Sequence, residues 1–202
     1  IRPAASLIIA SPITVNNSVS SFTTSNSKHE QGSAGCNYRI LMMKRNASSF
    51  INAHVYPGGV IDRADHYSHW GHFLTNKICA IRETFEESGL LLSDPPLTQL
   101  TGSSKASFLN SLPTWRQKVH HDASQFKVMC ETFNIRPAVD SLIPFSNWIT
   151  PVIEKKRYDT MFFLTVLDQY TSAEEEAKHL NLVSADGKET VLFDWFTPEE
   201  AL

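Results

Sequence analysis

The sequence has few cysteines, no long apolar run and no strong excess of either charge. Three of its 202 residues are cysteine, and Cys36, Cys79 and Cys130 lie far apart. An odd number of dispersed cysteines argues against a disulfide framework and favours a reducing compartment. No apolar run approaches the length of a transmembrane helix, so no membrane partner is expected. The net charge of −3 provides no basic surface, so nucleic acid is not an expected partner either.

What the sequence does contain is the composition of an ordinary globular domain. Hydrophobic residues make up 42% of the chain and charged residues 19%, which suffices for one large core. The chain starts at Ile1 rather than at methionine, and Leu202 falls inside an apparent helix start. We therefore expect one domain, residues 1–202, that is a fragment of a longer chain. Nothing in the composition indicates an oligomeric state.

Short apolar runs bounded by polar stretches predict a series of strands. The predicted strands cover residues 5–10, 38–44, 148–150, 160–167 and 191–196. A helical insertion is predicted at about residues 93–146, with helices near 112–121 and 123–133, the second capped by Asp122. A Thr-Pro pair at residues 197–198 predicts a closing helix start. This order of elements predicts an α/β sandwich with a mixed sheet.

The most informative stretch is "RETFEESG", which lies in a helix predicted over about residues 77–88 and ended by Gly89. At about 100° per residue, Glu83, Glu86 and Glu87 fall within one arc of about 100°. Apolar residues gather on the opposite face: Ile78, Ile81, Phe85 and Leu92. Three carboxylates on one face repel one another, and a hard divalent cation such as Mg²⁺ would offset that repulsion. The alternative is an acidic face exposed to water.

Together with "PGG" at Pro57–Gly59, this stretch resembles the signature of the Nudix hydrolases. In that signature five residues separate a glycine from a glutamate, and seven more separate that glutamate from Arg-Glu, which is followed after two residues by Glu-Glu-x-Gly. The second half matches at every fixed position from Arg82 to Leu90. In the first half Asp65 replaces the glutamate, and the spacer His66–Ile81 has 16 residues. We expect this spacer to bulge outward without moving either end, and Asp65, with its shorter reach, not to bind metal.

The resemblance implies a Nudix-type α/β/α sandwich with a mixed sheet, and Mg²⁺ or Mn²⁺ as the cofactor. Glu83 and Glu87 would be the main metal ligands, with Glu86 as a further or water-mediated ligand. Such ions neutralise phosphoryl charge and lower the pKa of bound water, so these glutamates are the catalytic candidates. Family members often have a general base outside the signature, and Glu189, six residues before Trp195, is its candidate here. A solvated loop carboxylate is the alternative for Glu189.

Other site residues follow from the same resemblance. Arg82 is expected to support the helix by pairing with a carboxylate rather than to contact phosphate. Gly58 and Gly59 permit backbone conformations closed to other residues and let their loop approach the metal and substrate. Three cations are candidates for contacts with substrate phosphates, the alternative being ordinary surface charges. They are Lys44, Arg45 and Arg157.

Further likeness points to one branch of the family, the acyl-coenzyme A diphosphatases of the Nudix motif 19 type found in animal peroxisomes. The similar segments include "AHVYPGGVIDRADH", "NWITPVIEKKRYDTMFFL" and "DWFTPEEAL". This resemblance implies that coenzyme A or acyl-coenzyme A is cleaved at its diphosphate to 3′,5′-ADP and (acyl-)4′-phosphopantetheine. It also implies an intracellular location, peroxisomal or mitochondrial, and an insertion that shapes the pantetheine or acyl side of the pocket. Two alternatives stay open: hydrolysis of an RNA cap, NADH or ADP-ribose, and a catalytically silent coenzyme A or nucleotide binding module.

Overall fold

The structure is a computed structural model that describes residues 1–13, 37–45, 53–66, 72–97, 99–100, 102–168 and 190–201. Its strands are β1 (Arg2–Pro12), β2 (Tyr38–Arg45), β3 (His54–Val55), β4 (Gly58–Val60), β5 (Ser93–Asp94), β6 (Arg136–Pro137), β7 (Ile143–Ile149), β8 (Tyr158–Val166) and β9 (Thr190–Phe196). Its helices are α1 (His72–Ser88), α2 (Gly102–His121) and α3 (Ser124–Thr132), with 3-10 turns η1 (Arg63–Asp65) and η2 (Val139–Ser141).

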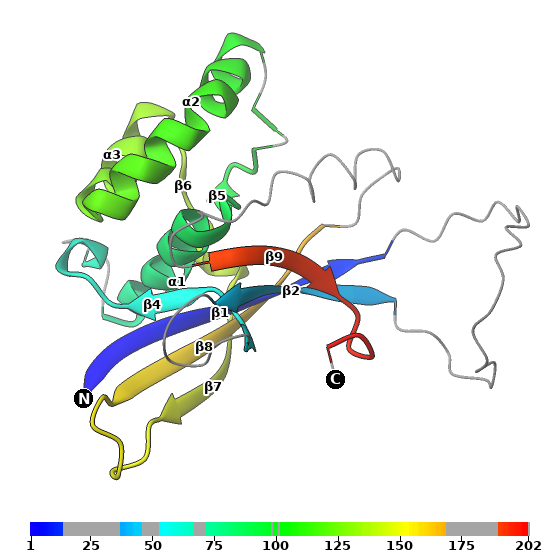
Figure 1. Cartoon of the computed structure of the whole chain (residues 1–202). Helices are drawn as coiled ribbons and strands as arrows, with labels where there is room; N and C mark the ends of the chain where they lie inside the picture. Colours follow the sequence, from blue (N-terminus) through cyan, green and yellow to red (C-terminus); the bar gives the residue numbers. More distant parts are fainter. Residues whose placement is uncertain are drawn as a thin grey trace, which may run out of the picture.

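The main sheet is mixed, as the sequence predicts. Within the described ranges its strand order is β3-β2-β1-β8-β7, with β4 also paired to β1 and β9 to β2. Strand β1 runs parallel to β8 and antiparallel to β2 and β4, so it lies at the centre of the sheet (Figure 1). Its residues from Ala4 to Ser11 are buried, because a central strand is covered by its neighbours and by both faces of the sheet.

Helix α1 packs against β1 and β4, and it is longer than expected. It begins at His72, five residues before the predicted start, so much of the long spacer is helix rather than an outward loop. The predicted end is confirmed, because Gly89 has a φ of 79° and its N–H donates to the carbonyl of Phe85 at 2.9 Å. This left-handed cap is a common way to terminate a helix.

The two helices predicted between residues 112 and 133 are present as α2 and α3. Helix α2 starts at Gly102, earlier than expected, and packs on both α1 and α3. The Asp122 carboxylate accepts a hydrogen bond from the Ser124 N–H at 2.9 Å, although Ala123 is the residue at the cap position itself. At the other predicted helix start, Thr197 and Glu200 exchange side chain to backbone hydrogen bonds of 2.8 and 3.3 Å, which form a capping box.

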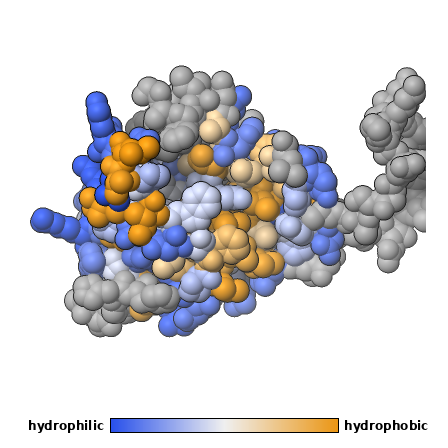
Figure 2. Space-filling model, turned by 90° about the horizontal axis from the view of Figure 1, so that it is seen from below, coloured by the Kyte–Doolittle hydropathy of each residue, from blue (hydrophilic) through white to orange (hydrophobic). Residues whose placement is uncertain are grey.

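All α-helices in the described ranges lie on one side of the sheet (Figure 1). The α/β sandwich is thus confirmed. Cys79 and Cys130 are buried free thiols. None of the described helices is long and apolar enough to cross a membrane. Viewed from below, apolar side chains gather at the surface between charged ones (Figure 2). Most of the large apolar residues that are more than half exposed lie on β7 and the turn after it: Ile143, Phe145, Trp148, Ile149, Val152 and Ile153.

Candidate active site

The acidic stretch of α1 lies directly against the glycine pair that begins β4. Gly58 donates its backbone N–H to Oε2 of Glu87 at 2.9 Å. A Cβ placed on Gly59 would stand 2.4 Å from the carboxyl carbon of Glu83. The predicted approach of this loop to the glutamates is therefore present, and it brings Glu83 and Glu87 to the same short strand.

Both glycines are required by space at this crossing. A Cβ on Gly58 would meet the carbonyl oxygen of Ala5 at 2.4 Å, so a side chain there would push β4 away from β1. Pro57 fixes the same approach, because its carbonyl accepts hydrogen bonds from the Leu7 N–H and the Ser6 hydroxyl, each at 2.9 Å. The "PGG" turn thus lets the backbones of β1, β4 and α1 pack closely together.

Arg82 pairs with three carboxylates rather than one. Its guanidinium contacts Asp65 at 2.7 and 3.0 Å, Glu86 at 2.5 Å and Glu83 at 3.0 Å, and its side chain is only 4% exposed. Burial by itself disfavours the charge, but the hydrogen bond to Asp65 and the charge of Glu83 outweigh it, so the pKa of Arg82 is raised. Arg82 is therefore a permanent buried cation at the centre of the acidic cluster.

Asp65 anchors that cation to the β4 side of the site. It ends η1, is 1% exposed, and holds Arg82 with both carboxylate oxygens. Its carboxylate also accepts the Asp62 N–H at 2.9 Å in a capping box. The fixed spacing of Asp65 from Gly59 in the sequence could have indicated this role. The shorter side chain suffices because η1 brings the backbone of Asp65 close to α1.

The carboxylates are buried, which rules out a simple solvated acidic face. Glu86 and Glu87 are 8% and 7% exposed. Burial raises the pKa of Glu83 to about 7, with Arg82 lowering it and the neighbouring charge of Glu86 raising it further. Buried carboxylates cost free energy unless cations compensate them, and Arg82 alone does not match the charges of Asp65 and the three glutamates.

The donor set fits a hard divalent cation. Mg²⁺ and Mn²⁺ prefer carboxylate oxygens, and at β4 Glu87 accepts the Gly58 N–H while Glu83 packs against Gly59. In the part of the chain that the structure describes, no three His, Cys, Asp or Glu side chains converge as a metal-binding group. Arg82 pairs with the carboxylates of Glu83 and Glu86.

Two residues of α2 that the sequence interpretation missed also reach the acidic cluster. Arg116 donates from Nε to the Glu86 carbonyl at 2.7 Å and from Nη2 to the Glu87 carbonyl. The Nδ1 atom of His120 lies 3.5 Å from Oε2 of Glu86. No pattern could have indicated these contacts, because about thirty residues separate the partners. They depend on how α2 docks on α1.

Two of the predicted phosphate-binding cations, Lys44 and Arg157, are not brought to this cluster. Lys44 follows the core residue Met43 on β2, so the alternation of a strand directs it to the face away from α1. Arg157 donates to the Thr150 carbonyl at 3.0 Å and so holds the turn between β7 and β8. The side chain of Arg45 and the whole of Glu189 lie outside the described residues.

A cavity of about 450 Å³ lies elsewhere, between the first turns of α1 and the β5, β6 and η2 segments. Its lining includes Leu74, Asp94, Arg136 and Ser141, and none of the clustered glutamates borders it. The candidate site is therefore defined by the acidic cluster at β4 and not by this cavity.

A mixed α/β sandwich in which a buried Arg-Glu…Glu-Glu helix meets a Gly-Gly strand defines a domain of the Nudix hydrolase class. A NUDIX hydrolase from Alicyclobacillus acidocaldarius has the same fold, with a TM-score of 0.64, 18% sequence identity, and coverage of 97% of this chain and 78% of that structure. Within the class, the chain belongs to the family described as the NUDT19 Nudix domain, whose model matches residues 72–202.

Curated relatives agree with this assignment. The Xenopus laevis protein named acyl-coenzyme A diphosphatase NUDT19 is 32% identical over 220 residues, which cover 82% of this chain and 54% of that protein. The Gallus gallus and Homo sapiens proteins of the same name are 30% and 27% identical, covering 83% and 81% of this chain. The chain thus spans about half the length of the curated relatives it matches.

Proposed function

We propose that this domain hydrolyses the diphosphate bond of coenzyme A or an acyl-coenzyme A with Mg²⁺ or Mn²⁺, giving 3′,5′-ADP and (acyl-)4′-phosphopantetheine. The observation that carries the diphosphatase chemistry is the buried cluster of Glu83, Glu86 and Glu87 against Gly58 and Gly59. The substrate class rests on the relatives, which are named acyl-coenzyme A diphosphatases.

In this proposal the chain's own residues orient the carboxylates. The Gly58 N–H fixes one oxygen of Glu87, and the missing side chain of Gly59 leaves room for Glu83. Glu86 is a further or water-mediated ligand. A bound divalent cation would neutralise phosphate charge and lower the pKa of a bound water.

The ion pair between Arg82 and Asp65 has a role that is separate from metal binding. The two contacts within this pair do not involve Glu83 or Glu86, so the buried guanidinium would keep a counter-charge if those glutamates held a metal. Leaving such a charge unpaired would cost about 3–5 kcal/mol. Because Asp65 alone can balance the charge of Arg82, the glutamates of α1 that pair with Arg82 could bind a metal cation instead.

Several assignments stay predictions of the resemblance. They are Glu189 as general base, phosphate contacts by Lys44, Arg45 and Arg157, the peroxisomal or mitochondrial location, and the shaping of the acyl side by the insertion. The positions of Lys44 and Arg157 in the structure do not favour their contacts with phosphate.

The decisive experiment compares substrates under one set of conditions. Rates are measured with coenzyme A, an acyl-coenzyme A, dephospho-coenzyme A, ADP-ribose and NADH, each with Mg²⁺ and with Mn²⁺, and products are identified by mass spectrometry. We expect the two coenzyme A substrates to be preferred and 3′,5′-ADP to appear. Much faster turnover of ADP-ribose or NADH would contradict the substrate but not the reaction class. Calorimetric binding of coenzyme A without any product would contradict catalysis.

A further inference from the structure

The last turn of α1 is held by a side chain from another helix. The final carbonyls of an α-helix have no partners within the helix. Here the carbonyls of Glu86 and Glu87 accept hydrogen bonds from Nε and Nη2 of Arg116, which lies in α2. A cation at this end also offsets the negative end of the helix dipole.

The two residues held in this way are the ones whose side chains enter the acidic cluster. Glu87 is consequently fixed at both ends, by Arg116 at its backbone carbonyl and by the Gly58 N–H at its carboxylate. Glu86 is likewise held by Arg116 at its carbonyl, while Arg82 and His120 face its carboxylate. Any rotation of this last turn would move both carboxylates relative to β4.

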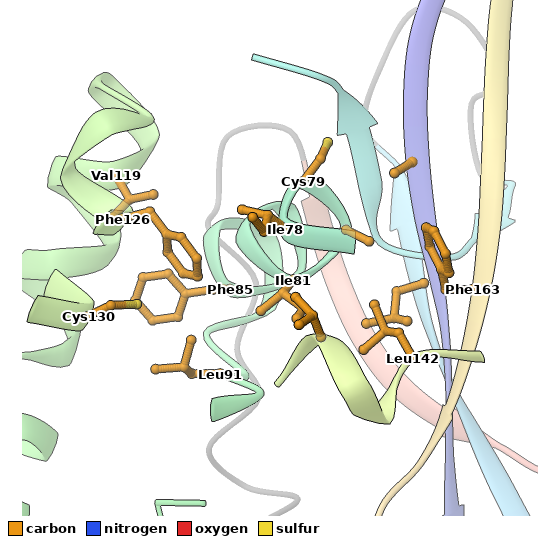
Figure 3. Close-up of a cluster of buried hydrophobic side chains, with 14 of the residues drawn as sticks. Ile78, Cys79, Ile81, Phe85, Leu91, Val119, Phe126, Cys130, Leu142 and Phe163 are labelled. Atoms are coloured by element: carbon orange, nitrogen blue, oxygen red, sulfur yellow. The ribbon is translucent and has the colours of Figure 1, made fainter. Parts of the chain in front are cut away.

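The packing around Arg116 makes this support rigid. Phe85 of α1 points toward the side chain of Phe126 of α3, and Val119 of α2 belongs to the same buried cluster (Figure 3). The rings of Phe85 and Phe126 are 6.2 Å apart, and all three residues are no more than 1% exposed. This apolar contact packs α1 against α3, which in turn packs on α2, while Arg116 of α2 binds the turn that follows Phe85.

We propose that Arg116 is a positioning residue of the metal site, which orients Glu86 and Glu87 by capping the carboxyl end of α1. The inference rests on the proposed function, because it assigns the two glutamates to a divalent cation. It also links the helical insertion to the metal site. Arg116 acts through α1, since it donates hydrogen bonds to two backbone carbonyls of that helix.

The test uses Mn²⁺ alone as the probe and the whole 202-residue chain. Mn²⁺ affinity is measured by electron paramagnetic resonance for Arg116→Ala, Arg116→Lys and the control Gln117→Ala, whose side chain is exposed on the same helix. We expect Arg116→Ala to weaken Mn²⁺ binding by about tenfold or more, the usual effect of losing a group that orients a ligand. The Mn²⁺ affinity of Arg116→Lys should lie between those of Arg116→Ala and the wild type, because an ammonium lacks the planar fork that reaches two carbonyls at once. Gln117→Ala should match the wild type.

Kinetics separate positioning from simple stabilisation. For Arg116→Ala at saturating Mn²⁺ we expect a lower kcat with little change in KM, and partial recovery in Arg116→Lys. A folded Arg116→Ala variant with wild-type Mn²⁺ affinity and kcat but a lower Tm would overturn the inference. If Arg116→Ala does not fold, wild-type Mn²⁺ affinity in Arg116→Lys would overturn it. A wild type that binds Mn²⁺ but cleaves no coenzyme A contradicts only the proposed substrate, because the Mn²⁺ titration needs no substrate.

Discussion

The carboxylate of Glu83 lies flat against the Cα of Gly59, so close that a Cβ at position 59 would stand within 2.6 Å of both of its oxygens. This contact joins the two halves of the signature across the long spacer. It explains why nine extra residues between them are tolerated, since the position of Glu83 depends on β4 and α1 rather than on the connection.

Gly59→Ala should therefore impair the metal site more than the fold. The added methyl group would displace the Glu83 carboxylate, and we expect Mn²⁺ affinity to fall by about tenfold or more. The matched variant Gly58→Ala should lower Tm more than Gly59→Ala does, because its methyl group meets the backbone of β1. Calorimetry and Mn²⁺ titration of both variants provide the check. Equal effects of the two substitutions on both measurements would contradict this division.

Glu87→Gln should abolish most turnover while leaving the fold intact. Glutamine retains the size of the side chain and an oxygen that can accept the Gly58 N–H, but it removes the charge. We expect kcat to fall by about 100-fold or more, the scale seen when a group that stabilises charge in the transition state is lost. The control is Glu131→Gln, on the exposed surface of α3. Wild-type kcat in Glu87→Gln would argue against a catalytic role for the cluster.

Arg82→Met should destabilise the metal-free protein strongly. It leaves Asp65 and the glutamates of α1 without their buried cation, which costs about 3–5 kcal/mol. The double variant Asp65→Asn with Arg82→Met should recover part of that loss, and so should added Mn²⁺. Urea unfolding with and without metal measures both effects. If the loss of unfolding free energy in the double variant equals the sum of the losses in the two single variants, Asp65 and Arg82 do not stabilise each other.

The stability of the metal-free protein should fall as pH rises from about 4.5 to 7. The pKa of Glu83 is raised from 4.5 to about 7, so in this range the folded state binds a proton that the unfolded state has lost. The slope is at most about 1.4 kcal/mol per pH unit for one proton. The stabilisation of the folded state by the protonated Glu83 is complete below pH 4.5 and disappears above pH 7. Glu83→Gln should flatten the dependence of the free energy of unfolding on pH in this range. An unchanged slope would show that another group causes the pH dependence.

The helices of the insertion should behave as part of the folding core. Phe126 is buried in the same cluster as Phe85, so Phe126→Ala should cost about 3–5 kcal/mol. Val128→Ala, at an exposed position of the same helix, should change stability by no more than about 0.5 kcal/mol. Replacing residues 93–146 with a Gly/Ser linker should then abolish folding. A folded linker variant with altered substrate preference would instead support an insertion that only shapes the pocket.

Local patterns were sufficient for most elements of the fold. The run "ASLIIA" predicted β1, since a strand covered on both faces is apolar along its length, and the apolar residues of "YRILMMK" predicted β2. Gly89 predicted the end of α1, because its left-handed conformation is disfavoured for residues with a side chain. The start of α1 was missed because its first turns contain no capping pattern that distinguishes helix from loop.

The sequence by itself determined which residues are chemically capable of holding a cation, because carboxylates at helical spacing must share a face of α1. It also indicated that Gly58 and Gly59 approach them. Only the tertiary structure decided that this face is buried, that Arg82 contacts three carboxylates at once, and that Arg116 holds the last turn of the helix. These features arise where β4 and α2 pack on opposite sides of α1. Contacts between segments about thirty residues apart depend on that packing and leave no periodic pattern in the chain.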